Sequence, residues 1–242
     1  MIPSLRRCEK SYGLPPFCPT TAEKLHAYSR HAKSKLASPQ PRDNTMTTAT
    51  RVLAISGSLR ASSVNTEMLR ACALLAPPSV HVTIFDGLGS LPHFNPDLDE
   101  EGVELPASVE DFRRQVGHAD AILISSPEYA HGVPGSLKNA LDWLVSASEL
   151  LYKPVGLLNA SPRSTYARAS LRETLATMST LLVPPALLDL PLVRSMVTAE
   201  RIAGNPEIAD RLRSALTSLR IAGEQYRLRS AEWREVVASA VL

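Results

Sequence analysis

The sequence predicts an α/β protein whose core is a doubly wound, five-stranded parallel sheet. Five short apolar segments alternate along the chain with longer helical segments. Parallel strands need such crossover connections, because the chain must return to the same end of the sheet before the next strand begins. At 242 residues, with 44% apolar and 21% charged residues, the chain is long enough for one domain of this kind and an additional segment.

The first 50 residues differ from the rest in composition, being rich in Pro, Ser, Thr and positive charge and lacking a sustained apolar period. We expect residues 1 to 50 to be a poorly ordered or mis-assigned N-terminal extension, and residues 51 to 242 to form the folded domain. Met46 is the expected natural start, because a short polar lead then precedes the first strand; N-terminal sequencing that finds residues ahead of it would contradict this. An organelle transit peptide is the alternative.

Charge and cysteine content narrow the class of protein further. Residues 1 to 45 hold eight Lys or Arg and three acidic residues, whereas the remainder holds 18 basic and 21 acidic residues. A mildly acidic folded part predicts no nucleic-acid partner. No stretch reaches the roughly 18 consecutive apolar residues of a membrane span, so we expect a soluble protein without a membrane partner. Cys8, Cys18 and Cys72 form no paired framework, which predicts a reducing, cytoplasmic setting, no metal site and a buried Cys72.

The first expected strand, residues 52 to 55, leads into a polar loop and then a helix that Pro77 and Pro78 stop after about Ala76. The first turn of a helix leaves backbone N–H groups unpaired and carries about half a positive charge, so it suits an anion. Neutral and cationic donors surround this turn: Ser58, Arg60, Ser62, Ser63, Asn65 and Thr66. An ordinary strand-to-helix turn with Ser and Asn caps is the alternative.

The next elements continue the alternation. Residues 80 to 85 are β-branched and alternate in polarity, which predicts the second strand. Residues 86 to 106 form a long polar segment of the length that is usually functional or mobile. A helical period covers residues 108 to 119, and the wholly apolar residues 121 to 124 predict the third strand.

A second loop, residues 125 to 135, has a different chemistry. Its prolines and glycines stiffen and thin the backbone, while Tyr129 and His131 present flat side chains. Exposed N–H groups beside aromatic surface suit a planar heterocycle. A packed Tyr129 and a surface or capping His131 are the structural alternatives. Together, an anion at the first strand and a flat ring at the third describe a mononucleotide cofactor.

The remaining elements follow the same order. We expect helices at residues 136–148, 167–181 and 206–237 and strands at residues 154–160 and 186–192. Pro184, Pro185 and Pro191 keep the last strand short or at an edge. A third loop, residues 161 to 166, leaves the fourth strand. All three loops leave carboxyl ends of parallel strands, so they can share one site.

Two motifs resemble those of a known family. GSLRASSVN at residues 57 to 65 is similar to the GSxRxxSxN phosphate loop of the NADPH-dependent FMN reductase family, and residues 127 to 143 are similar to its PEYxxxxPGxLKNAxDW segment. The resemblance spans about residues 51 to 192. It implies a flavodoxin-like fold with strand order 2-1-3-4-5, FMN as cofactor, NADPH or NADH as electron donor, and a homodimer or homotetramer with the flavin near the subunit interface.

The resemblance also implies roles for particular residues. Ser58, Arg60, Ser63 and Asn65 would hold the FMN phosphate, and Pro127, Glu128 and Tyr129, with the backbone of Ala130, His131 and Gly132, would line the isoalloxazine ring. From their places in the first and third loops, Thr66, Ser161 and Arg163 are also expected to bind the cofactor, with Arg163 near the far edge of the ring. No side chain is expected to be catalytic, because FMN carries the chemistry. Structural or interface roles are implied for the polar residues of the second motif, Lys138, Asn139 and Asp142, and Trp143 is expected to pack at the margin of the helix.

The sequence departs from the family pattern at two places. Ala130-His131 stands where the family often has an Asn soon after the Tyr, and the third loop contains no Gly. Close backbone approach to a flavin is harder without glycine. Arg163 could instead meet a cofactor phosphate or stabilise reduced flavin, and Tyr166 could cover the site.

The expected function is therefore an NAD(P)H-dependent FMN/quinone oxidoreductase. Hydride would pass from nicotinamide to flavin N5 and on to a quinone, flavin, azo compound or similar small-molecule acceptor. A non-catalytic flavodoxin-like module with weak or no flavin binding is the alternative. A phosphoryl-transfer enzyme is disfavoured, because the first loop lacks the GK[ST] ending of a P-loop and holds no Cys or Asp nucleophile.

Overall fold

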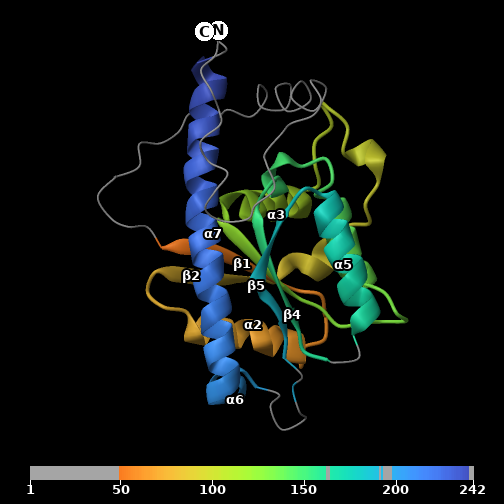
Figure 1. The fold of residues 1–242 in the computed structure, drawn as a ribbon. Coiled ribbons are helices and arrows are strands. Elements are labelled where there is room, and N and C mark those ends of the chain that lie inside the picture. The colour runs from red at the N-terminus through yellow and green to blue at the C-terminus, as the bar shows by residue number, and fades with distance from the viewer. Residues whose placement is uncertain (1–48, 162–163, 191, 193–197, 240–242) are drawn as a thin grey trace. The chain divides into compact units, whose positions relative to one another are not determined.

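The computed structural model describes residues 49–161, 164–190, 192 and 198–239, with side chains up to residue 232. The expectations for residues 1 to 48, including the start at Met46, and for Arg163 lie outside these residues. Five parallel strands form one sheet in the order β2-β1-β3-β4-β5 (Figure 1). The strands are β1 (Thr50–Ser56), β2 (Val80–Phe85), β3 (Ala121–Ser125), β4 (Pro154–Asn159) and β5 (Leu181–Asp189). This confirms the predicted doubly wound sheet and its strand order.

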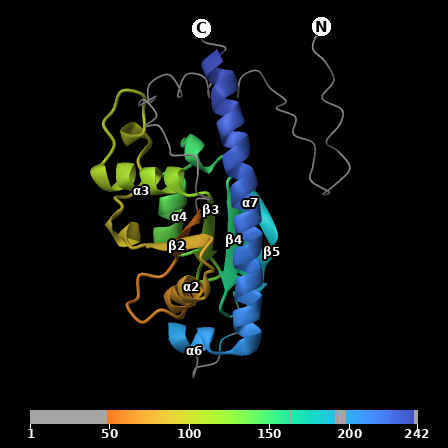
Figure 2. The ribbon, with the colours of Figure 1, turned by 90° about the vertical axis from the view of Figure 1, so that its left-hand side faces the viewer.

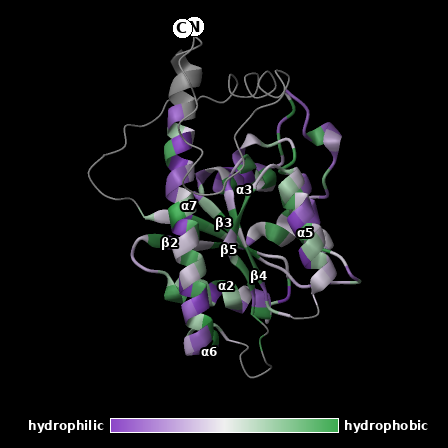
Figure 3. Cartoon of the chain, in the orientation of Figure 1, coloured by the Kyte–Doolittle hydropathy of each residue, from purple (hydrophilic) through white to green (hydrophobic). Residues whose placement is uncertain are grey.

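Helices cover both faces of the sheet. They are α2 (Val64–Leu75), α3 (Ala107–His118), α4 (Gly135–Asp142), α5 (Thr165–Thr177), α6 (Ala199–Ala203) and α7 (Pro206–Ser239). Helices α3, α4 and α5 bury their apolar residues in one cluster with the sheet, and α2, α6 and α7 bury theirs in a second cluster on the other face (Figure 2). Figure 3 shows the hydrophobic strands at the centre and many hydrophilic residues along α7.

The fifth strand begins earlier than expected. It runs for nine residues from Leu181, so the prediction of a short strand was wrong, whereas its place at an edge of the sheet is confirmed. The register with β4 shifts between Val155 and Leu157, so the strand bulges past the exposed Pro184 and Pro185. A bulge at an edge accommodates residues without an N–H group, because no ladder hydrogen bond is needed there.

Two helices are shorter than predicted. Helix α4 ends at Asp142 rather than near residue 148, and short turns lead from there to a 3₁₀ turn, η3 (Ser148–Leu150). Helix α5 ends at Thr177, and Ser179 then adopts a left-handed conformation with φ of 59°. This conformation reverses the chain directly into β5. The long segment between β2 and α3 contains only two 3₁₀ turns, η1 (Gly87–Ser90) and η2 (Pro96–Leu98).

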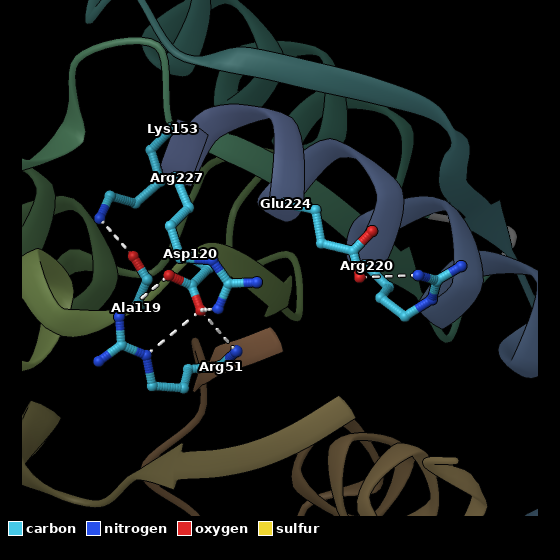
Figure 4. Close-up of polar contacts among 7 residues, drawn as sticks. All are labelled: Arg51, Ala119, Asp120, Lys153, Arg220, Glu224 and Arg227. Carbon is cyan, nitrogen blue, oxygen red and sulfur yellow. Dashed lines mark hydrogen bonds and ion pairs between the residues drawn. The ribbon is translucent and has the colours of Figure 1, made fainter. Parts of the chain in front are cut away.

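A buried carboxylate lies at the amino end of the sheet, beneath α7 (Figure 4). Asp120 Oδ2 accepts hydrogen bonds from the backbone N and Nε of Arg51 at 2.9 and 3.2 Å, and its Oδ1 accepts one from Arg51 Nη2 at 3.0 Å. Arg227 of α7 approaches the same carboxylate, with Nη1 3.6 Å from Oδ2. On the same helix, Arg220 pairs with Glu224 at 2.7 Å. The carboxylate therefore links β1, β3 and α7.

Lys153 is a second charged residue at the amino end of the sheet, and it is fully buried. Its Nζ donates hydrogen bonds to the carbonyl oxygens of Val116 at 2.6 Å and Ala119 at 2.7 Å, and it lies 4.9 Å from the centre of the Tyr226 ring on α7. Carbonyls at the end of α3 carry partial negative charge, so they stabilise a cation there. Lys153 thereby connects α3, the start of β4 and α7.

Helix α7 crosses β1 closely at Gly223. A Cβ at this position would lie 2.8 Å from Thr50 Cγ2 and 3.4 Å from Asp120 Cβ. Thr50 is buried, and its Oγ1 finds no hydrogen-bond partner among the described residues. Glycine is thus required here for close helix packing. Over the described ranges, no helix combines the length and the apolar character that crossing a membrane needs.

Candidate functional site

The first loop leaves the carboxyl end of β1 and enters α2 through Ser63. The Ser63 side chain caps the helix, its Oγ accepting from Thr66 N at 3.5 Å, and the residue is buried. Arg60 lies exposed in the loop, and its backbone N donates to Ser58 Oγ at 3.3 Å. The loop before α2 therefore carries hydroxyl and guanidinium groups close in sequence to the positive end of the helix, and their contact with an anion stays a prediction.

Asn65 and Thr66 face the strand ends. Asn65 is 8% exposed, and its Oδ1 accepts a hydrogen bond from Ser125 Oγ at 2.9 Å at the end of β3. The Thr66 and Ser56 hydroxyls are 2.8 Å apart. In this arrangement both side chains fasten α2 to β1 and β3, and their contact with a phosphate stays a prediction.

Gly57 brings the first loop against the second. Its backbone N donates to Ser125 O at 2.8 Å, and a Cβ at this position would lie only 2.5 Å from Ser126 Oγ. The glycine is needed because the two loops touch here. The loops that leave β1 and β3, which are paired neighbours in the sheet, are therefore in direct contact.

The second loop folds into a tight turn at Tyr129–Gly132. The backbone N of each of these two residues donates to the carbonyl of the other, at 3.1 and 2.9 Å. The central residues Ala130 and His131 have φ of 48° and 60°, the pattern of a type I′ turn. Residues with a side chain seldom adopt this conformation, although Asn, Asp and His do so more often than others, and it costs on the order of 1 kcal/mol at Ala130. The turn leaves Tyr129 57% exposed.

Glu128 connects the second loop to the start of α5. Its Oε2 accepts a hydrogen bond from the backbone N of Ala167 at 2.8 Å, in the first turn of that helix. A carboxylate satisfies an unpaired N–H there and interacts favourably with the helix dipole. Pro127, which precedes it, forms part of the same loop and has its carbonyl hydrogen-bonded by Ser126 Oγ at 3.0 Å. Glu128 thus joins two of the predicted site loops.

His131 makes a further connection between the same two loops. Its ring stacks on the ring of Tyr166, the second residue of α5, with centroids 4.3 Å apart and planes 9° apart. Both side chains are exposed, Tyr166 by 58%. His131 belongs to one of the two segments that depart from the family pattern, and Tyr166 belongs to the other. The two segments are therefore in contact through this aromatic pair.

A crevice lies beneath these loops, between α5 and the carboxyl ends of β3 and β4. Its walls combine apolar side chains with a polar rim: Ile124, Ser126, Leu157, Leu158, Asn159, Ser164, Ala167, Arg168 and Leu171. Asn159 Oδ1 accepts from Ser161 N at 3.2 Å, which places the predicted site residue Ser161 beside this rim. Crevices at this end of a parallel sheet are the usual ligand sites of such folds.

Sequence reasoning missed a polar cluster at the crevice. Asp189 at the end of β5 accepts hydrogen bonds from Asn159 Nδ2 at 2.9 Å and from Arg168 Nη1 at 2.5 Å. The sequence signal that could have predicted this cluster is the polar residue at the end of each of two neighbouring strands, Asn159 in β4 and Asp189 in β5. This cluster fixes the orientation of the Arg168 guanidinium, which lines the crevice.

The polar residues of the second motif hold the long segment before α3. Asn139 Oδ1 accepts from Phe94 N at 2.8 Å, and its Nδ2 donates to Pro92 O at 2.9 Å, where Trp143 Nε1 also donates at 2.8 Å. Lys138 instead pairs with Asp142 at 2.6 Å on the helix surface.

Arg113 fixes a later part of this segment. Its Nη2 donates to Asp99 Oδ1 at 2.8 Å, and its Nε donates to Trp143 O at 2.8 Å. The segment between β2 and α3 is thus tied to both α3 and α4.

Two observations concern thiol and metal chemistry in the part of the chain that the structure describes. Burial raises the pKa of the Cys72 thiol to about 12, so it is not a nucleophile near neutral pH. Within the part of the chain that the structure describes, no three His, Cys, Asp or Glu side chains gather as metal ligands would.

The fold and this geometry define a class of protein. A polar loop after β1 that leads into a helix N-terminus, touching a loop with exposed aromatic surface after β3, in a sheet of order 2-1-3-4-5, is the arrangement of a flavodoxin-like, mononucleotide-binding oxidoreductase. The chain belongs to the NADPH-dependent FMN reductase family, whose sequence model matches residues 50–190.

Relatives with curated names agree with this family. An NAD(P)H-dependent FMN reductase of Pseudomonas aeruginosa is 41% identical over 130 residues, which cover 52% of this chain and 69% of that protein. A quinone reductase of Escherichia coli is 38% identical over 114 residues, 46% of this chain and 60% of its own length. Among solved structures, the flavoenzyme NAD(P)H:(acceptor) oxidoreductase FerB of Paracoccus denitrificans superposes with a TM-score of 0.63 at 26% identity, covering 74% of this chain and 99% of that one.

Proposed function

We propose that this protein binds FMN in residues 51 to 242, takes a hydride from NADPH or NADH, and passes it to a quinone, flavin, azo compound or similar planar acceptor. The observation that carries the proposal is the contact between the first two loops at Gly57 and Ser126, because it joins the anion site to the aromatic turn. Family membership and the names of the relatives support the same activity.

The residues present fit the phosphate of FMN. Ser58 and Arg60 offer neutral and charged donors in front of α2, and the first-turn N–H groups of that helix offer more. A phosphate oxygen bound by Arg60 would form the stronger, charge-assisted kind of hydrogen bond. Asn65 would act by holding the loop against Ser125 in the geometry that binding requires.

The second loop fits the flat ring of the cofactor. Tyr129 offers exposed aromatic surface, and the backbone from Ala130 to Gly132 is held in a turn with a defined shape. The exposed surface of Tyr129 beside this turn suits a planar heterocycle. Bound FMN would supply the hydride chemistry at N5, and the protein would supply position and electrostatics.

Partners and compartment complete the proposal. We propose a homodimer or homotetramer in the cytoplasm, acting on small molecules and not on nucleic acid or membranes. The family resemblance supports the oligomer, and the absence of a paired cysteine framework in the sequence supports the reducing compartment. Light scattering of the purified protein measures the oligomeric state directly.

Colour is the decisive test of this function. Protein that is purified or reconstituted with FMN should show flavin absorbance bands, and anaerobic NADPH should bleach them. Addition of a naphthoquinone should then restore the absorbance. Protein that stays colourless after reconstitution, or flavin that NADPH does not bleach, would favour the non-catalytic module instead.

A further inference from the structure

Two exposed aromatic rings meet at the ligand end of the sheet. His131 comes from the loop after β3 and Tyr166 from the start of α5, and their rings stack with a 4.3 Å centroid distance and a 9° angle. Because β3 and β4 are paired neighbours, the stack bridges the loops at two adjacent strand ends. Residues that neighbour Tyr166 in sequence, Ser164 and Ala167, line the crevice.

Core packing does not explain this pair. Tyr166 is 58% exposed, and His131 is exposed as well, so each ring keeps a large surface in contact with water. His131 also has a φ of 60°, a left-handed conformation that residues with a side chain seldom adopt, His more often than most. Such conformations persist only where the surrounding structure holds them, and they cluster at active sites and ligand-binding segments. Here the Tyr129–Gly132 hydrogen bonds and the Tyr166 ring hold it.

We propose that His131 and Tyr166 form a preassembled stacking platform for the planar second substrate, and that they determine the preference of this protein for aromatic acceptors. The proposal rests on the proposed function, because the platform matters only beside a bound flavin. A flat quinone can extend the existing stack with an offset or edge contact, as aromatic pairs prefer. A compact, non-planar oxidant such as ferricyanide has no face to stack.

The two rings are stacked before substrate arrives, and this favours affinity. Glu128 holds the first turn of α5 at Ala167, next to Tyr166, and the I′ turn holds His131. Ordering of flexible side chains on binding costs free energy, so a platform that is already ordered avoids that cost. Removal of either ring should therefore weaken acceptor binding with little effect on the flavin phosphate contacts at α2.

The test uses FMN-loaded protein and the variants Tyr166→Ala, Tyr166→Phe and His131→Ala. A naphthoquinone is titrated into the oxidised holoprotein, and binding is followed by perturbation of the flavin absorbance. We expect the dissociation constant, and the KM for the quinone, to rise about three- to tenfold in both alanine variants. Tyr166→Phe keeps the ring and should stay near the wild-type value. The KM for ferricyanide should not change in either Tyr166 variant.

Two controls separate the possible outcomes. Tyr152→Ala removes an exposed tyrosine just before β4, at the opposite end of that strand, and should leave quinone binding unchanged. Equal quinone affinity in wild type and both alanine variants, or a parallel rise in the KM for ferricyanide in Tyr166→Ala, would overturn the platform. Failure of the wild-type protein to retain FMN would overturn the proposed function itself, and flavin absorbance reports that separately.

Discussion

Glu128 Oε2 accepts a hydrogen bond from the backbone N of Ala167 at 2.8 Å, so a loop that leaves β3 caps the helix that follows β4. This hydrogen bond holds the loop after β3 against the start of α5, and no cofactor atom takes part in it. We expect Glu128→Ala to destabilise the apoprotein by about 1 kcal/mol, the usual cost of a lost helix cap. Glu128→Gln keeps an acceptor but loses the charge, and should cost less. Urea unfolding measures both; equal stability of all three proteins would contradict the cap.

Arg60 should contribute strongly to phosphate binding although it lies exposed. Arg60→Ala removes a charge-assisted hydrogen bond, worth roughly 1.5 to 3 kcal/mol, so the dissociation constant for FMN should rise by about tenfold or more. Quenching of FMN fluorescence on titration with apoprotein gives this constant. Arg114→Ala, at an exposed pair with Asp111 on α3, is the matched control. Unchanged affinity in Arg60→Ala would remove Arg60 from the phosphate site.

Asn139 should stabilise the segment between β2 and α3. Asn139→Leu leaves the Phe94 N–H without its partner and removes one of two donors to Pro92 O, at an expected cost of about 1 to 3 kcal/mol. Limited proteolysis should also cut residues 86 to 106 faster. Lys138→Ala, which removes only the surface pair with Asp142, should change stability by no more than about 0.5 kcal/mol. Equal effects of the two variants would contradict this assignment.

Gly223 and Thr50 should be energetically coupled. Gly223→Ala places a methyl group 2.8 Å from Thr50 Cγ2, and overpacking of this kind costs about 1 to 3 kcal/mol against a gain of about 1 kcal/mol in helix propensity. We expect a net loss of stability that largely disappears in the Thr50→Ala background. Thermal or urea unfolding of the wild type, the two single variants and the double variant gives the coupling energy of a double-mutant cycle. Additive effects would show that the close contact carries no energy.

Cys72 should make stability depend on pH in the alkaline range. Burial raises the thiol pKa from 9.0 to about 12, so between these values the unfolded chain releases a proton that the folded chain retains. The free energy of unfolding therefore falls with rising pH, by up to about 1.4 kcal/mol per unit from this group. Cys72→Ala should show a correspondingly shallower slope. In the native protein at pH 8, the thiol should resist a disulfide reagent until urea is added.

The sheet was predictable because each strand is a short apolar or alternating run that local sequence alone identifies. Apolar runs such as residues 121 to 124 are buried on both faces, and parallel crossovers permit few arrangements of five such strands. The end of α5 and the early start of β5 were not predictable, because a left-handed Ser179 and a bulge around Pro184 depend on neighbouring strands. Propensity alone extends the helix through this region.

The site was predictable in its loops and less so in its contacts. The motif indicates Ser58 and Arg60 as phosphate ligands, and this stays a prediction, whereas the structure shows that Asn65 Oδ1 accepts a hydrogen bond from Ser125. Side-chain partners from distant segments, such as Ala167 for Glu128 and Tyr166 for His131, follow from the three-dimensional packing of loops. Local sequence carries no information on which loop tips will touch.

The position of Lys153 has a consequence for engineering this protein. Lys153 lies under the Tyr226 ring and Asp120 lies near Arg227, so these two buried charges connect α7 to the amino ends of the strands, whereas the loop after β3 and the start of α5 lie at the carboxyl ends. Libraries that randomise Tyr129, His131 or Tyr166 leave these connections intact. Such libraries should yield mostly folded proteins, so variants that prefer different electron acceptors can be selected with little loss of stability.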